Sequence, residues 1–126
     1  MLDILVVDDE TDIQFLFRQF FRRAIRKGEV QFRFAASGEE ALGVLQEQNL
    51  SIVLVLSDIN MPGMTGLQLL ERIKATHPTV KVVMITAYGS EEKQTEALAL
   101  GADGYLTKPV NFGDVRSIIY DLAQPD

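Results

Sequence analysis

"SIVLVLSD", residues 51–58, is a run of aliphatic side chains between two serines that ends in an aspartate. Successive side chains of a β-strand point to opposite faces of a sheet, so this segment would present apolar groups on both faces. Such a strand is typical of the centre of a parallel sheet, where helices cover it above and below. The segment therefore predicts an α/β fold, with Asp58 at the end of a central strand.

Other short apolar runs alternate with longer segments of helical periodicity. The five expected strands are Ile4–Val7, Val30–Ala36, Ile52–Leu56, Val80–Ile85 and Tyr105–Leu106. Because parallel neighbours need crossover helices, five strands alternating with five helices predict a doubly wound parallel sheet. "VQFRFAA", at 30–36, alternates apolar and polar residues and is expected at an edge of the sheet. No repeat or linker interrupts the chain, so one domain is expected over residues 1–126.

Start signals precede several of the expected helices. Capping boxes are expected at Thr11-x-x-Gln14, Ser37-x-x-Glu40 and Thr65-x-x-Gln68, and plain N-caps at Ser90 and Asn111. The first helix should bury one broad apolar face, which consists of Ile13, Leu16, Phe17, Phe20, Phe21 and Ala24. Phe15 falls on the opposite face of that helix and should be exposed.

The composition narrows the class of protein. The 126 residues are 47% hydrophobic and 24% charged, as in ordinary globular domains. A net charge of −6 argues against a basic face that binds nucleic acid. Cysteine is absent, which excludes disulfides and thiolate metal sites. Neither a signal peptide nor a membrane-spanning run is recognisable, so a cytoplasmic location and no membrane contact are expected.

Polar residues stand where four of the expected strands end. Asp8 and Asp9 follow the first strand, Asp58 the third, Thr86 the fourth and Lys108 the fifth. In open parallel sheets, ligands bind in the crevice beyond the carboxyl ends of the strands. These acids, the hydroxyl and the ammonium group should therefore converge on one site.

The chemistry of this set points to phosphoryl transfer. Three carboxylates form an oxygen-rich site suited to Mg²⁺, and a lysine ammonium can bind a phosphate oxygen. A hydroxyl can donate to the same group, and a carboxylate that attacks phosphorus forms an acyl phosphate. Charge stabilisation and positioning then provide most of the catalysis.

Four motifs give the sequence a specific resemblance. They are "VVDDE" at 6–10, "SDINMPGMTG" at 57–66, "ITAYGS" at 85–90 and "GADGYLTKP" at 101–109. Together they make the chain similar, over essentially its whole length, to the receiver domain of two-component response regulators. The resemblance implies a flavodoxin-like sheet of strand order 2-1-3-4-5, the order found in the chemotaxis members of this family.

The resemblance also implies a role for each site residue. Asp58 would be the phosphoacceptor and a metal ligand. Asp9 would bind Mg²⁺ directly, Asp8 would assist through water, and the backbone carbonyl of Asn60 would be a further ligand. Lys108 would pair with Asp58 at rest and with the phosphoryl group afterwards.

Further positions match the residues through which the members of this family respond to phosphorylation. Thr86 would turn inward to bond a phosphoryl oxygen, and Tyr105 would follow it. The switching surface would comprise the helix after Ser90, the strand at 105–106 and the last helix. Pro109 resembles the family's cis proline. The residue two places after Thr86, Tyr88, is expected beside the entrance to the site, where it would influence the lifetime of the acyl phosphate.

Partners follow from the same resemblance. The phosphodonor would be a sensor histidine kinase or a histidine phosphotransfer protein, and Phe15 is either a docking residue on the first helix or a scattered surface apolar group. The output partner would be a downstream protein target or a second copy in a homodimer. Since little sequence follows the last helix, the chain is expected to be a stand-alone receiver or a receiver taken from a longer protein.

Two other functions fit part of the pattern. Asp58 and Asn60 resemble the Asp-x-Asp arrangement of haloacid-dehalogenase-like phosphatases, although Asn60 cannot act as an acid or base there. The fold could also serve as an interaction module that is never phosphorylated. Several of these residues also have a purely structural explanation. The acids at 8–10 could be a solvated strand end, Thr86 could be present because threonine favours strands, and Tyr105 could pack in the core.

Overall fold

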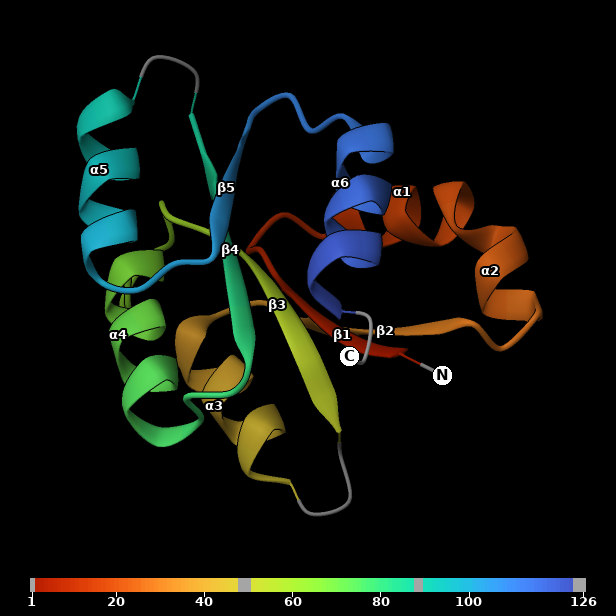
Figure 1. The fold of residues 1–126 in the computed structure, drawn as a ribbon, viewed down its shortest axis with the longest axis horizontal. Helices are drawn as coiled ribbons and strands as arrows, with labels where there is room; N and C mark the ends of the chain where they lie inside the picture. Colours follow the sequence, from red (N-terminus) through yellow and green to blue (C-terminus); the bar gives the residue numbers. More distant parts are fainter. Residues whose placement is uncertain (1, 48–50, 88–89, 124–126) are drawn as a thin grey trace.

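The computed structural model describes residues 2–47, 51–87 and 90–123. Five parallel strands form one sheet in the order β2-β1-β3-β4-β5, as expected (Figure 1). The strands are β1 (Leu2–Val7), β2 (Val30–Ala35), β3 (Ile52–Asp58), β4 (Lys81–Thr86) and β5 (Gly104–Thr107). The helices are α1 (Asp12–Phe20), α2 (Arg22–Arg26), α3 (Gly38–Gln46), α4 (Gly66–Thr76), α5 (Glu91–Ala99) and α6 (Phe112–Ile118), which a π-helical turn, Ile119–Ala123, extends.

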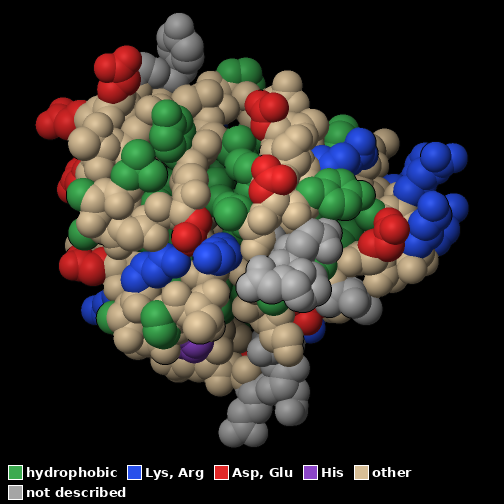
Figure 2. All heavy atoms as spheres, in the orientation of Figure 1, with side chains coloured by type: hydrophobic (Ala, Val, Ile, Leu, Met, Phe, Trp, Pro, Cys, Tyr) green, Lys and Arg blue, Asp and Glu red, His purple; other side chains and the backbone are tan. Residues whose placement is uncertain are grey.

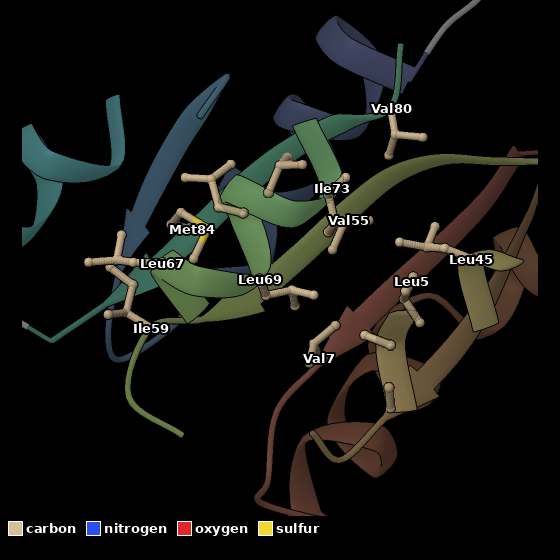
Figure 3. Packing of buried hydrophobic residues seen from close by; sticks show 14 of the residues in the cluster. Leu5, Val7, Leu45, Val55, Ile59, Leu67, Leu69, Ile73, Val80 and Met84 are labelled. Carbon is tan, nitrogen blue, oxygen red and sulfur yellow. The ribbon is translucent and has the colours of Figure 1, made fainter. Parts of the chain in front are cut away.

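Helices cover both faces of the sheet, and each face has its own apolar core. On one face α3, α4 and α5 cover the strands, and Leu69 and Ile73 of α4 pack near Val55 and Met84 (Figure 3). On the other face α1, α2 and α6 cover the sheet (Figure 1). The central strand contributes to both cores, because Val55 belongs to the first and Leu54 to the second. The two-sided apolar pattern of β3 thus has the structural cause that the sequence predicts.

The helix count differs from the prediction. Five helices are expected, whereas the described residues contain six α-helices, because the first expected helix is divided at Phe21. Phe21 has φ −96° and ψ 18°, outside the helical region, yet its N–H still donates to the carbonyl of Phe17. Its ring is buried against the rings of Phe17 and Phe32. Neither glycine nor proline marks this break in the sequence.

The predicted cap signals have mixed outcomes. Thr65 and Gln68 form a complete capping box at the start of α4. The side chain of Asn111 accepts backbone hydrogen bonds from the first turn of α6. Ser37 accepts from the N–H of Glu40, whose carboxylate accepts instead from Ala36, so that box is incomplete. Thr11 and Ser90 occupy the N-cap positions of α1 and α5, as predicted, but neither side chain makes a capping hydrogen bond, so the capping box expected at Thr11 is not formed.

The apolar face of the first helix is only partly buried. Phe17 is fully buried, whereas Leu16 and Phe20 remain 45% and 40% exposed. Phe20 stacks on Phe112 of α6, and the guanidinium of Arg116 lies 4.8 Å from its ring centre. Phe15 is 67% exposed, as the helical spacing predicts. Among the helices described, none has the length and apolar character that crossing a bilayer requires.

Gly66 lets α4 begin directly against the end of β3. Its N–H donates to the carbonyl of Ile59 over 2.8 Å. A Cβ atom at this position would overlap the carbonyl oxygen of Asp58 and lie 2.6 Å from the Cα of Ile59. Both neighbours are backbone atoms, so a side chain would displace either α4 or the loop that carries Asp58.

We expect Gly66→Ala to lower the free energy of unfolding by about 2 kcal/mol or more, because the methyl group overpacks a backbone contact. Gly43→Ala is the matched control: it lies inside α3 with open space around a new Cβ, and should stabilise by roughly 0.5–1 kcal/mol. Urea denaturation measures both values. Equal stability of the two variants would contradict the close approach of α4 to Asp58.

Candidate functional site

The carboxyl ends of the strands bring the predicted polar residues together. The ammonium of Lys108, just after β5, lies 3.0 Å from Oδ2 of Asp58 at the end of β3. The same ammonium lies 3.9 Å from Oδ2 of Asp8, which follows β1. Lysine and two acids that are distant in the sequence therefore share one site.

Three carboxylates of this site can face one ion. One carboxylate oxygen each from Asp8, Asp9 and Asp58 lies within 4.8 Å of the others. Asp8 and Asp58 are 7% and 4% exposed, whereas Asp9 is open to solvent. Buried like charges repel one another unless a cation compensates them. An all-oxygen set with one solvent-accessible member fits Mg²⁺, which keeps several of its water ligands.

The loop after β3 holds the carboxylate of Asp58 in place. The N–H of Asn60 donates to Oδ1 of Asp58 over 3.3 Å, while Oδ2 receives the lysine. The hydroxyl of Ser57 donates to the carbonyl of Asp58 over 3.0 Å. Gly63, which follows Pro62, has a φ of 75°, a left-handed conformation that glycine adopts without steric strain. Asn60 itself is exposed beside the acids.

The electrostatics of the site disfavour the charged form of Asp8. Burial raises the pKa of Asp8, and the negative charge of Asp58 raises it further. The 2.8 Å hydrogen bond from the N–H of Glu10 and the positive charge of Lys108 lower it, but the net shift is upward. Burial lowers the pKa of Lys108, but its hydrogen bond to Asp58 and the charges of Asp58, Asp8 and Glu10 raise it overall. Lys108 is therefore charged at neutral pH, and Asp8 carries its charge at a free-energy cost.

Thr86 ends β4 inside the molecule, with 1% of its surface exposed. Its hydroxyl donates to the carbonyl of Leu106 in β5 and accepts from the amide nitrogen of Gln94 in α5, each over 3.4 Å. Sequence reasoning missed Gln94, whose signal is its position one turn into the helix that follows Thr86. The threonine thus connects the site to both α5 and β5.

The remaining predictions concern residues on β5 and just after β4 and β5. Tyr105 is 43% exposed on β5, so it is not simply core packing. Lys108 and Pro109 are joined by a cis peptide bond, in agreement with the resemblance. Tyr88 lies outside the described residues.

The raised pKa of Asp8 gives a prediction for the metal-free protein. The charged form of Asp8 is disfavoured in the folded state, so Asp8 lowers the free energy of unfolding at pH values above its folded pKa. This cost disappears as the carboxyl group is protonated in acid. Asp8→Asn keeps the acceptor for Glu10 and should raise the melting temperature at neutral pH on the order of a few degrees. The gain should vanish as the pH falls below about 4, where the unfolded carboxyl is also protonated.

Thermal unfolding in EDTA across this pH range measures the effect. Asp12→Asn, which removes an exposed acid from the first turn of α1, is the control and should not stabilise. Millimolar Mg²⁺ should reduce or reverse the advantage of Asp8→Asn. A variant less stable than the parent at neutral pH in EDTA would contradict the unfavourable charge of Asp8.

Comparisons with known proteins agree with this site. The family model described as response regulator receiver domain matches residues 4–120. Sporulation initiation phosphotransferase F of Bacillus subtilis is 32% identical over 116 residues, which cover 92% of this chain and 89% of that protein. Response regulator protein PilR of Pseudomonas aeruginosa is 36% identical over 115 residues, which cover 91% of this chain. The chain corresponds to only 24% of the length of PilR.

Solved structures give the same result. A CheY-like response regulator receiver domain protein from Methanospirillum hungatei has a TM-score of 0.82 at 34% identity, covering 96% of this chain and 92% of that one. Chemotaxis response regulator CheY4 of Vibrio cholerae has a TM-score of 0.78 at 30% identity, covering 97% and 98%. The strand order of the sheet agrees with these matches. The family model covers most of the chain and shows that the chain belongs to the response regulator receiver domain family.

Proposed function

We propose that the chain is a phosphorylation switch in which Asp58 accepts a phosphoryl group from a phosphohistidine. Members of its family act as such switches and interact with histidine kinases or phosphotransfer proteins, so the donor is a protein of one of these two kinds, in the cytoplasm. One observation carries the proposal: a nearly buried carboxylate that binds a lysine ammonium and lies within a cluster of acids.

Each residue of the site has a part in the transfer. The Asp58 carboxylate attacks phosphorus, a new P–O bond forms, and the P–N bond to the donor imidazole breaks with its electron pair returning to nitrogen. Asp58, Asp8, Asp9 and the backbone carbonyl of Asn60 would hold Mg²⁺, which supplies positive charge for the phosphoryl oxygens. Lys108 is already at Asp58 and neutralises a further oxygen without a large rearrangement.

The readout uses the contacts of Thr86. A phosphoryl group adds about 1.5 to 2 negative charges and three acceptor oxygens beside this hydroxyl. When the hydroxyl donates to the phosphoryl group, it gives up the carbonyl of Leu106, and Gln94 loses its acceptor in the present position. The change reaches the surface formed by α5, β5 and α6, where Tyr105 moves with Thr86. This surface would bind a downstream protein or a second copy.

The alternative of a phosphohydrolase has less support. A phosphatase of that kind needs a second acid two residues after the nucleophile, and Asn60 stands there. An interaction module without phosphorylation needs no reactive site, yet each acid and the lysine of the site are in place. We propose instead that the domain promotes only the hydrolysis of its own acyl phosphate, with Asn60 and Tyr88 influencing its lifetime.

Acetyl phosphate tests the assignment of Asp58. With Mg²⁺, intact-mass spectrometry should detect one added phosphoryl group on the parent, and Asp58→Asn should remove it completely because the amide is not a nucleophile. Asp12→Asn is the matched control and should be modified like the parent. EDTA should prevent labelling. Modification that persists in Asp58→Asn would contradict the assignment, and rapid turnover of small phosphate esters would favour the phosphohydrolase.

Thr86→Ala tests the readout. The variant keeps Asp58 and Lys108, so acetyl phosphate should still label it, but the NMR signals of the Tyr105 ring should no longer shift on phosphorylation. Thr76→Ala removes a hydroxyl that bonds the carbonyl of Arg72 at the far end of α4, and should leave the Tyr105 response intact. A normal Tyr105 shift in Thr86→Ala would show that the signal takes another route.

A further inference from the structure

A basic groove lies away from the phosphorylation site, along the open edge of β2. Six of the 12 lysines and arginines of this acidic chain fall within residues 18–33, a stretch whose only acid is Glu29. Arg18, Arg22 and Arg26 follow one another at four-residue intervals and are all exposed. Figure 2 shows Lys and Arg side chains gathered on the side of the molecule where α2 lies in Figure 1.

Two adjoining hollows form this groove, with volumes of about 350 and 340 Å³. Both are lined by Arg18, Gln31 and Phe32. The first continues along α2 past Arg22 and Arg26, and the second extends across the strand to Glu47, beside α3. The groove therefore follows β2 and has arginines on its α1–α2 side.

The strand beneath the groove has unused backbone groups. β2 is the first strand of the sheet order and pairs only with β1 among the strands described. The N–H of Leu2 donates to the carbonyl of Glu29, and the N–H of Asp8 to that of Ala35. In a parallel ladder the residues that face the neighbour alternate. The peptide groups of residues 30, 32 and 34 consequently face outward and can pair with another strand.

No arginine of the groove forms an ion pair with an acid of the described part of the chain, although Glu47 lines the second hollow. The ion pairs among the described residues are formed by Lys74, Lys81 and Lys108. The guanidinium of Arg18 lies 5.1 Å from the ring centre of Phe34, which holds it over the strand. The Nε of Arg33 is buried without a hydrogen-bond partner among the described residues.

We propose that this groove binds an extended acidic segment of a partner protein, which adds to β2 as a sixth strand. The backbone of the segment would pair with the outward peptide groups, and every second side chain would be a carboxylate that faces Arg18, Arg22 and Arg26. A second copy of this chain is a poor occupant, because pairing two β2 edges would bring the same arginines together. Complementary charge thus selects a different, acidic protein.

A short peptide of alternating threonine and glutamate is the probe. Titrated into the ¹⁵N-labelled protein at low salt, it should shift the amide signals of β2 and α2, and the affinity should fall as salt rises. The double variant Arg22→Glu with Arg26→Glu should weaken binding at least about tenfold, whereas Arg72→Glu with Lys93→Glu changes the net charge equally on α4 and α5 and should have little effect. Acetyl phosphate labelling should persist in both, which shows that they are folded.

Two further probes separate strand addition from simple charge attraction. The same peptide with alternate backbone nitrogens methylated keeps its carboxylates but cannot complete the ladder, and should bind much more weakly. Single-stranded DNA and vesicles of anionic lipid carry charge without a peptide backbone, and should not compete at equal charge concentration. Undiminished binding of the methylated peptide, preferential binding of DNA or vesicles, or shifts confined to other faces would each overturn the proposal.

Discussion

The pairing of one ammonium group with two buried carboxylates is the interaction on which this molecule depends. Lys108 contacts Asp58 directly and lies near Asp8, so it offsets charges that would otherwise destabilise the carboxyl end of the sheet. The compensation is incomplete, because the pKa of Asp8 stays raised. An acid cluster that is short of positive charge attracts a cation, and a cation bound there would in turn attract the oxygens of a phosphoryl group.

Much of this arrangement follows from the sequence because the topology of parallel sheets is simple. Once "SIVLVLSD" is placed as a central strand, the ends of its neighbours must meet at the same end of the sheet, and Asp58 and Lys108 meet with them. The break at Phe21 was not predictable, because a buried ring and an unusual ψ leave no mark in the residue pattern. Gln94 was missed for a related reason: a helix can turn any of its faces inward until packing sets its rotation.

The surface carries two regions of opposite charge, although the net charge of −6 suggests an acidic molecule throughout. Acids gather at the carboxyl end of the sheet, and arginines gather along β2 and α2. An average over the composition conceals this division, because it records the sum of the charges and not their positions. The two regions present different chemistry to partners, so occupation of one need not block access to the other.

Asp103 connects elements at the end of the sheet opposite the acid cluster. One of its carboxylate oxygens accepts from the ammonium of Lys74 in α4 and from the N–H of Val82 in β4, over 2.8 and 2.9 Å. Asp103 lies between α5 and β5, whereas Gln94 connects that helix to Thr86 by a single long hydrogen bond. The segment that follows α5 is therefore tied to α4 and β4 through Asp103, whereas the first turns of the helix reach Thr86 through Gln94. A displacement of the Thr86 hydroxyl would accordingly disturb the N-terminal part of α5 first, while the chain after the helix keeps its contacts with α4 and β4.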